Sequence, residues 1–316
     1  MNDPILIAEW LPDGVFERLQ AEFPHAKLID ARSAEIRDAR LKDAVAVYGL
    51  PPIEQIQSAP KLRWIQLISA GVPWDLCPVA RGRGITVTNL SGLYGTTIAE
   101  HALAMMLQLS RNLHIAFAQQ QRRIWDRTLR ETMRDLHGAT LGIVGAGDIG
   151  QSIARLCRAL GMRVVGCRRT PQPTPYVDQV YPIGDLQAML AECDVLAVAA
   201  PLTAQSENML GTAEFAALKR GAIYINVSRG GIAQEQALLA ALQSGHVAAA
   251  GLDVFAVEPL APDHPFWSMP QVLVSPHYSG ETINLSARPA ERFARNLSRW
   301  LKHEPLEGLV DLEAGY

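Results

Sequence analysis

The sequence predicts an α/β fold made of two doubly wound parallel-sheet domains. First, short runs rich in Val and Ile alternate with helix-like segments in both halves of the chain, which is typical of a parallel sheet covered on both faces. Second, 316 residues are enough for two domains of ordinary size, each with its own core. Third, a glycine-rich loop, Gly145–Gly150, lies between an apolar run and a helix-like run in the second half.

Five apolar runs bounded by Pro, Gly or Asp predict the strands of the first domain. They are residues 5–8, 26–29, 44–48, 64–69 and 85–88. A long amphipathic helix is predicted for residues 96–113, because apolar side chains such as Ile98, Leu103 and Met106 recur there at helical spacing. The segment 118–135 is rich in Gln and Arg and lacks this period, so we interpret it as an arm or linker rather than core.

The second domain begins with a strand at residues 140–144. Further strands are predicted at 163–166, 195–199, 222–227, 248–252 and 272–274, and helices at 151–160 and 235–244. A last helix, about 287–301, is too short for a domain and is expected to pack back on the first one. We therefore predict a flavodoxin-like substrate domain at 1–93, completed by about 285–316, and a Rossmann dinucleotide-binding domain at 94–284.

Composition excludes several classes of protein. With 48% hydrophobic and 19% charged residues the chain is typical of a globular protein, and its low charge favours an oligomer. A net charge of −3 gives no electrostatic case for nucleic acid or an anionic membrane. The start of the chain shows no basic region or cleavage site, and no apolar stretch approaches a membrane span, so a cytoplasmic location is expected.

The cysteines and histidines do not form a recognisable metal or redox motif. Cys77, Cys157, Cys167 and Cys193 lack CxxC spacing, so we interpret them as small core residues in a reducing compartment. The eight histidines form no zinc-like pairing, and no metal is expected.

The glycine loop has the context of a dinucleotide site, since it links a predicted strand to a predicted helix. Gly145 permits the tight turn, Gly147 allows a pyrophosphate to approach the backbone, and Gly150 allows the helix to pack on the strand. The helix N-terminus would present free N–H groups to the phosphates. A glycine-rich turn of another α/β protein is the alternative.

The end of the next strand bears on the choice of dinucleotide. NAD enzymes usually place Asp or Glu about 20 residues after the loop, to bind the ribose hydroxyls. Here Arg168 stands 18 residues after Gly150 and Arg169 follows, with no carboxylate between them. Two guanidinium groups suit a 2′-phosphate, so we favour NADP(H), with NAD(H) as the alternative. A solvated Arg pair on a loop is the structural interpretation.

Three residues in fixed order fit the reduction of a 2-oxo acid. Arg229 follows a predicted buried strand and is suited to hold a carboxylate and polarise a carbonyl. His277 follows Pro276 at the end of another strand and is suited to proton transfer. Glu258, between them, would pair with His277 and raise its proton affinity. A structural Arg, a surface Glu and an inert His are the alternatives, which their ordered co-occurrence disfavours.

Several segments resemble the D-2-hydroxyacid dehydrogenase family. The likeness runs from about Ile65 onward and is most specific in the last half. Its motifs are 97–103, Gly145–Gly150, Pro201-Leu202-Thr203, Asn226–Gly231, Gly251–Pro259, Pro265-Phe266-Trp267 with Pro270-Gln271-Val272, and Ser275–His277. Val72–Asp75 and Tyr278–Gly280 depart from the usual family pattern, and Tyr278 is a candidate for shaping the pocket.

The resemblance implies roles for the residues of these motifs. Arg229 would anchor the substrate, Glu258 would pair with His277, and His277 would be the general acid/base. Asp253 would hold the nicotinamide amide, and backbone N–H groups near Ala70 and Gly71 would receive the substrate carboxylate. The remaining residues expected to line the cofactor are Ile98, Asp148, Ile149, Pro201, Val227 and Ser279.

The resemblance also bears on assembly and subclass. Family members are commonly dimers, joined through the cofactor domain and the arm around Trp125, which either reaches a neighbour's active site or is a core aromatic. Arg168 stands where Asp is usual, as in members similar to glyoxylate/hydroxypyruvate reductases. Phosphite oxidisers of the family carry a Lys near Ala70 that is missing here, which argues against that subclass.

We therefore predict a reductase that transfers hydride from NADPH to C2 of a small 2-oxo acid and gives a D-2-hydroxy acid. Its site would lie in the cleft between the domains. Glyoxylate and hydroxypyruvate are the leading substrates, phenylpyruvate is the runner-up, and the direction in the cell is open. A nucleotide-sensing or corepressor-like protein without useful turnover is the rival, although it has less need of an intact Arg–Glu–His set. An interaction-only scaffold would leave the glycine loop unexplained.

Overall fold

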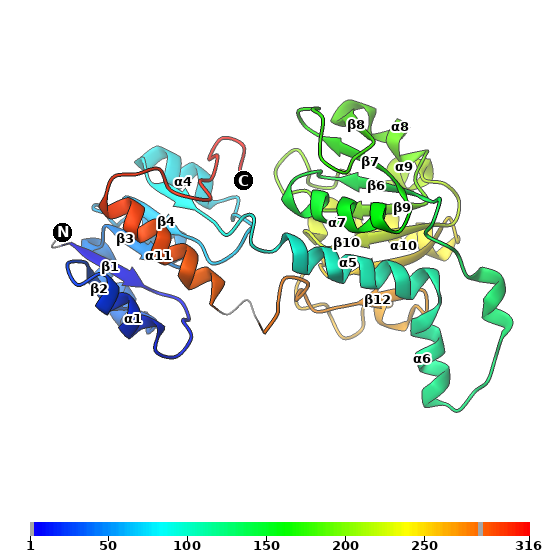
Figure 1. Ribbon diagram of the computed structural model, residues 1–316, viewed down its shortest axis with the longest axis horizontal. Helices are drawn as coiled ribbons and strands as arrows, with labels where there is room; N and C mark the ends of the chain where they lie inside the picture. The colour runs from blue at the N-terminus through cyan, green and yellow to red at the C-terminus, as the bar shows by residue number, and fades with distance from the viewer. Residues whose placement is uncertain (1–2, 284–286) are drawn as a thin grey trace. The chain divides into compact units, whose positions relative to one another are not determined.

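The computed structural model describes residues 3–283 and 287–316, and the chain divides into two compact units (Figure 1). Unit 1 comprises residues 1–94 and 282–316, and unit 2 comprises residues 95–281. Each unit contains one sheet whose strands all pair in parallel. The predicted fold class is confirmed. The expected return to the first domain at about residue 285 falls on residues outside the described part of the chain.

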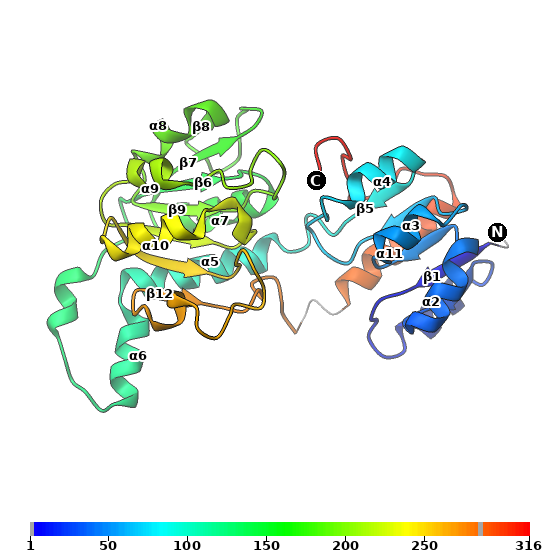
Figure 2. The same cartoon turned by 180° about the vertical axis from the view of Figure 1, so that it is seen from behind.

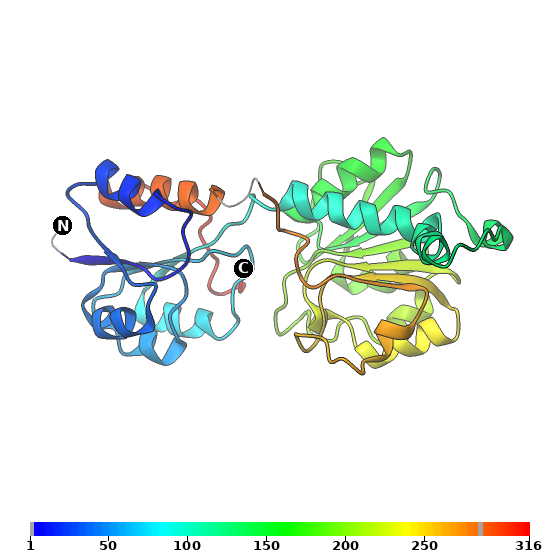
Figure 3. The same ribbon diagram turned by 90° about the horizontal axis from the view of Figure 1, so that it is seen from below.

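Unit 1 has a five-stranded sheet in the order β2-β1-β3-β4-β5. Its strands are β1 Pro4–Ile7, β2 Lys27–Asp30, β3 Ala46–Tyr48, β4 Trp64–Gln66 and β5 Thr86–Thr88. Its helices are α1 Val15–Glu22, α2 Ala34–Arg40, α3 Ile53–Gln57, α4 Leu76–Arg83 and α11 Arg288–Leu301. Figure 3 shows helices on both faces of this sheet, and Figure 2 shows α2, α3 and α4 together on one of them.

The last helix belongs to the core of unit 1, although it lies nearly 200 residues from β5 in the sequence. Phe293 of α11 stacks on Trp64 with ring centres 5.6 Å apart and also contacts Tyr48 at 5.0 Å. Asn296 donates to the side chain of Gln66 at 2.8 Å. Burying the apolar face of α11 on this sheet explains why the chain returns to its first half.

Unit 2 has a seven-stranded sheet in the order β12-β11-β10-β9-β6-β7-β8. Its strands are β6 Thr140–Val144, β7 Arg163–Arg168, β8 Gln179–Pro182, β9 Val195–Val198, β10 Ala222–Asn226, β11 Val247–Leu252 and β12 Val272–Val274. Its helices are α5 Gly95–Ser110, α6 Leu113–Gln121, α7 Asp148–Ala159, α8 Leu186–Leu190, α9 Thr212–Ala217 and α10 Glu235–Gln243. The chain order reverses at β6, so the edge beside β6 and β9 is a topological switch point.

Several details differ from the sequence prediction. The predicted helix 96–113 ends at Ser110, because Asn112 adopts a left-handed conformation (φ 52°) and α6 starts after it. The segment 118–135 therefore contains the end of α6, but α6 has no buried residue, as expected of an arm. Helix α7 begins at Asp148, three residues before the predicted start. Strand β8 was not predicted.

The four cysteines are buried and unpaired. Burial raises the pKa of the Cys157 and Cys193 thiols to about 12, so both are protonated at neutral pH. This confirms that they are core residues. No described helix has the length and apolar character needed to cross a membrane.

Candidate active site

The glycine loop lies at the switch point of unit 2, directly after β6. Gly145 has a φ of 92°, and a Cβ there would clash with the backbone of Ala200. A Cβ on Gly150 would clash with the carbonyl oxygen of Gly145. A Cβ on Gly147, in contrast, would have no atom within 4 Å. The fold itself thus requires two of the glycines, while Gly147 leaves open space at the N-terminus of α7, where a phosphate group would fit.

Arg168 is the last residue of β7, the strand next to β6. Its Nη1 donates to Thr174 Oγ1 at 3.3 Å. With the Gln172 amide turned to satisfy both of its atoms, Gln172 Oε1 accepts from the same Nη1 at 3.1 Å. The guanidinium is therefore held by a hydroxyl and an amide. Both groups are neutral, so they do not compensate its positive charge. Arg169 follows on the exposed side of the loop.

The Arg229 loop follows β10 and is fixed by a buried amide. Asn226 Nδ2 donates to the carbonyl of Arg229 at 3.1 Å, and Asn226 Oδ1 accepts from the backbone and hydroxyl of Ser228. A Cβ on Gly230 would clash with the backbone of Phe255, so the loop packs directly on the segment that precedes Glu258. Burial lowers the pKa of the Arg229 guanidinium, opposed by the charge of Glu258. A cation that has lost much of its hydration gains more from a bound carboxylate.

Glu258 and His277 form a hydrogen-bonded pair. His277 Nδ1 lies 2.7 Å from Glu258 Oε2, while Glu258 Oε1 accepts the backbone N–H of Phe255 at 2.9 Å. Both carboxylate oxygens are thereby engaged, and the imidazole is fixed with its Nε2 directed away from the carboxylate. The side chains are 43% and 35% exposed, so the pair is accessible to a substrate. His277 has a φ of 52°, an uncommon conformation for a residue with a side chain.

Asp253 holds the turn that carries His277. Its carboxylate is fully buried. Oδ1 accepts the hydroxyl of Ser275 at 2.6 Å and the backbone N–H of Tyr278 at 3.1 Å, and Oδ2 accepts the N–H of Ser279 at 3.0 Å. The expected contact of Asp253 with a nicotinamide amide stays a prediction. The structure gives this carboxylate three hydrogen bonds that the sequence did not reveal.

A cleft of about 550 Å³ brings the three predicted catalytic residues together. It is lined by Leu202, Glu207, Asn208, Arg229, Gly230, Gly231, Phe255, Ala256, Glu258 and His277. Glu207 and Asn208 were missed by the sequence analysis, although they follow the quoted Pro201-Leu202-Thr203 motif closely. Arg229, Glu258 and His277 follow β10, β11 and β12, which are neighbours in the sheet, so the carboxyl ends of parallel strands assemble the site.

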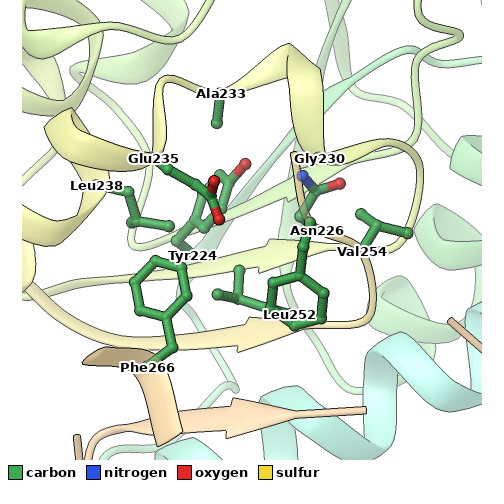
Figure 4. Close-up of a pocket in the computed structure, with 10 residues that line it drawn as sticks. Tyr224, Asn226, Gly230, Ala233, Glu235, Leu238, Leu252, Val254 and Phe266 are labelled. Carbon is green, nitrogen blue, oxygen red and sulfur yellow. The ribbon is translucent and has the colours of Figure 1, made fainter. Parts of the chain in front are cut away.

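A smaller cavity of about 10 Å³ lies beneath the Arg229 loop, bordered by Tyr224, Asn226, Gly230 and Phe266 (Figure 4). Figure 4 shows Asn226 next to Gly230 at one side of it. Its volume is that of about one water molecule, so it is too small for a substrate. Of these two cavities, the larger cleft has the volume for a small substrate.

The other predicted residues occupy several places. Ile98 lies in the first turn of α5, Pro201 and Val227 follow β9 and β10, and Ser279 is buried beside Asp253. Ala70 and Gly71 lie after β4 in unit 1, where Asn89 donates to the Ala70 carbonyl at 2.8 Å. Their expected part in substrate binding stays a prediction.

Trp125 is 93% exposed, so its interpretation as a core aromatic is wrong. Tyr278 is 48% exposed and directly follows His277. Among the described residues, no group of three His, Cys, Asp or Glu side chains is placed to hold a metal ion.

The chain is similar to known proteins over most of its length. The family model described as D-isomer specific 2-hydroxyacid dehydrogenase, NAD binding domain, matches residues 103–279. The chain is 34% identical to the glyoxylate reductase of Korarchaeum cryptofilum, over 99% of this chain and 97% of that protein. It is 30% identical to the D-3-phosphoglycerate dehydrogenase of Archaeoglobus fulgidus, covering 98% of this chain but 59% of that protein.

A solved structure is similar over its whole length. It is the NADPH-dependent glyoxylate/hydroxypyruvate reductase of Sinorhizobium meliloti in complex with NADP and sulfate. The TM-score is 0.84 at 27% identity, with complete coverage of both chains.

Proposed function

Because the chain belongs to the D-isomer specific 2-hydroxyacid dehydrogenase family, we propose that it reduces a small 2-oxo acid at C2 with NADPH and releases a D-2-hydroxy acid. Glyoxylate and hydroxypyruvate are the leading substrates, and phenylpyruvate is the runner-up. The observation that carries the proposal is the meeting of Arg229, Glu258 and His277 in one cleft. A bound nicotinamide cofactor would supply the hydride.

Arg229 binds the carboxylate of the substrate and polarises its carbonyl. Its partly desolvated guanidinium donates one N–H to the Ser228 carbonyl at 2.7 Å and keeps further donors for a ligand. Asn226 bonds the backbone carbonyl of Arg229 and so fixes the loop that carries the guanidinium, and a fixed guanidinium binds a planar carboxylate at a lower cost in conformational entropy. A preorganised Arg contributes to binding and to the orientation of the carbonyl carbon.

His277 delivers the proton. Its Nδ1–H is donated to Glu258, so the proton that leaves comes from Nε2 and goes to the oxygen on C2 as hydride adds to that carbon. Glu258 stabilises the imidazolium before the transfer and keeps the ring oriented after it. In the oxidation direction the same nitrogen accepts the hydroxyl proton.

The preference for NADPH is supported by Arg168. Strand β7 ends in a guanidinium where NAD enzymes usually carry an acidic side chain, and Thr174 and Gln172 hold that guanidinium at the loop. Arg168 would pair with the 2′-phosphate, with Arg169 adding charge. The similar reductase from Sinorhizobium meliloti was solved with NADP.

A homodimer is the proposed assembly. Leu113, Phe117 and Trp125, on α6 and the segment after it, are 53%, 62% and 93% exposed, and such apolar side chains are typical of an interface. Light scattering of the purified chain would give the mass. A monomer at assay concentration would contradict this part of the proposal.

The first experiment is to follow NADPH and NADH oxidation by absorbance with a panel of 2-oxo acids that includes glyoxylate, hydroxypyruvate and phenylpyruvate. We expect turnover of the two small acids with NADPH preferred. A preference for NADH would overturn the cofactor assignment and leave the reaction. Cofactor binding without turnover of any acid would overturn the reaction and favour a nucleotide sensor.

A further inference from the structure

His101 belongs to a motif of the sequence analysis but has no part in the proposed reaction. It lies on α5, and its side chain is 21% exposed. Its Nε2 is 2.9 Å from Ser275 Oγ, and its ring meets the ring of Tyr278 edge-on, with centres 5.5 Å apart. Ser275 and Tyr278 stand on either side of Pro276 and His277, so His101 contacts the turn at both ends.

The direction of each hydrogen bond follows from the groups involved. Ser275 Oγ lies 2.6 Å from Asp253 Oδ1, and a carboxylate only accepts, so the serine hydrogen points to Asp253. Ser275 Oγ must then accept from His101, which places a proton on His101 Nε2. Burial lowers the pKa of His101, opposed by the carboxylate of Asp253, so the ring is neutral at pH 7. The result is a directed chain from His101 through Ser275 to Asp253.

The turn needs such support. His277 sits in the left-handed region at φ 52°, a conformation that is unfavourable for a residue with a side chain and persists only when the surroundings enforce it. Asp253 binds the turn from one side through Ser275, Tyr278 and Ser279. His101 binds it from α5, a 16-residue helix that packs on β10 and β11.

We propose that His101 is a positioning residue, which braces the turn 275–279 and thereby keeps His277 on Glu258. The inference rests on the proposed function in one respect, that His277 is the proton donor. His101 acts through Ser275 and Tyr278 and contacts neither substrate nor His277 in this arrangement. The effect belongs to the transition state, because the position of the proton donor matters most during transfer.

The test compares His101→Ala with His101→Gln. The alanine variant should lose roughly 10- to 100-fold in kcat, as expected for a small displacement of a reacting group. Its KM for the 2-oxo acid and its affinity for NADPH should change less than about threefold, since neither ligand is bound by His101. The glutamine variant keeps an N–H donor toward Ser275 and should recover most of the lost rate. Glu100→Gln, an exposed neighbour on the same helix, is the matched control and should behave as wild type.

Two kinetic outcomes would overturn the proposal. One is an alanine variant with wild-type kcat. The other is an equal loss in the alanine and glutamine variants, which would indicate that an N–H donor to Ser275 does not support the reaction. Thermal melting of each variant identifies a loss caused by unfolding, and the glutamine variant keeps the test decisive if the alanine variant does not fold.

A second measurement needs no substrate. Nitrogen NMR of the imidazole rings should find the proton of neutral His101 on Nε2 and the Nδ1–H of His277 bonded to Glu258. His101→Ala should weaken the second signal. If this coupling is present but no 2-oxo acid is reduced, the proposed function fails and the positioning role stands. If 2-oxo acids are reduced but the His277 signals do not change in His101→Ala, the positioning role fails and the proposed function stands.

Discussion

Replacing Glu258 with Gln removes one negative charge and almost no volume from the site. In the wild type, Oε1 of Glu258 accepts the Phe255 N–H and Oε2 accepts the His277 Nδ1–H. In Glu258→Gln the amide oxygen stays on Phe255, because that N–H needs an acceptor, so the NH₂ group faces His277. An NH₂ group cannot accept from Nδ1–H. The imidazolium thus loses its partner and meets a donor instead.

The magnitude follows from the exposure of the pair. A hydrogen bond to a charged group contributes about 1.5–3 kcal/mol when it is well shielded. Since His277 and Glu258 are 43% and 35% exposed, solvent screening places this one nearer the low end. A loss of about 1–2 kcal/mol in the transition state corresponds to a fall in kcat of roughly 5- to 30-fold, since 1.4 kcal/mol is a factor of ten.

The assay is steady-state reduction of the best 2-oxo acid found in the panel, with the cofactor dissociation constant and the melting temperature measured alongside. Asp263→Asn is the matched control, because Asp263 is an exposed carboxylate on the loop that follows Glu258. We expect its kcat to stay within about twofold of wild type. The reasoning is refuted if Glu258→Gln keeps more than half of the wild-type kcat, or if the control loses as much.

Three further predictions concern the cofactor loop and stability. Gly147→Ala should leave the free energy of unfolding within about 0.5 kcal/mol of wild type and weaken cofactor binding, measured by calorimetry, at least tenfold. Gly150→Ala should weaken binding and also lower the melting temperature, because its Cβ would clash with Gly145. Normal cofactor affinity in Gly147→Ala would contradict the loop assignment. Arg168→Asp should weaken NADPH far more than NADH in competitive titrations, and equal losses would exclude the 2′-phosphate contact. Burial lowers the pKa of His101 below its ordinary 6.5, so the unfolded chain binds this proton first as the pH falls. The free energy of unfolding, measured in urea, should therefore decrease below about pH 6.5. His101→Gln should lack the part of the decrease that His101 causes.

The sequence was sufficient to predict those parts of the fold and site that depend on a pattern extending over many residues. Parallel strands end at one edge of a sheet, so the residues after β10, β11 and β12 could be expected to meet once the strands were recognised. Features set by one residue escaped prediction. The left-handed Asn112 ends α5 within an unbroken apolar pattern, and β8, Gln179–Pro182, carries too few β-branched residues to be recognised as a strand.

Contacts between residues distant in sequence could not be predicted, for a different reason. Asp253 binds the turn 22 to 26 residues ahead of it, and His101 reaches Ser275 across 174 residues. A motif identifies such residues as a set, but only packing tells which atoms meet. Glu207 and Asn208 could not be predicted for the same reason, since their place in the cleft depends on the course of a loop without periodic sequence.

The two carboxylates that follow β11 illustrate how environment divides the work at this edge of the sheet. Asp253 is fully buried, and its oxygens are engaged by three donors from the turn 275–279, so a change in its charge would release the turn. Glu258 is about one-third exposed, holds one backbone N–H and keeps its other oxygen for His277. A proton donor must change its charge in every turnover, and a partner in contact with solvent accommodates that change at lower cost than a buried one. The buried carboxylate of Asp253 is therefore suited to hold the turn 275–279, and the accessible carboxylate of Glu258 is suited to pair with a histidine whose charge changes.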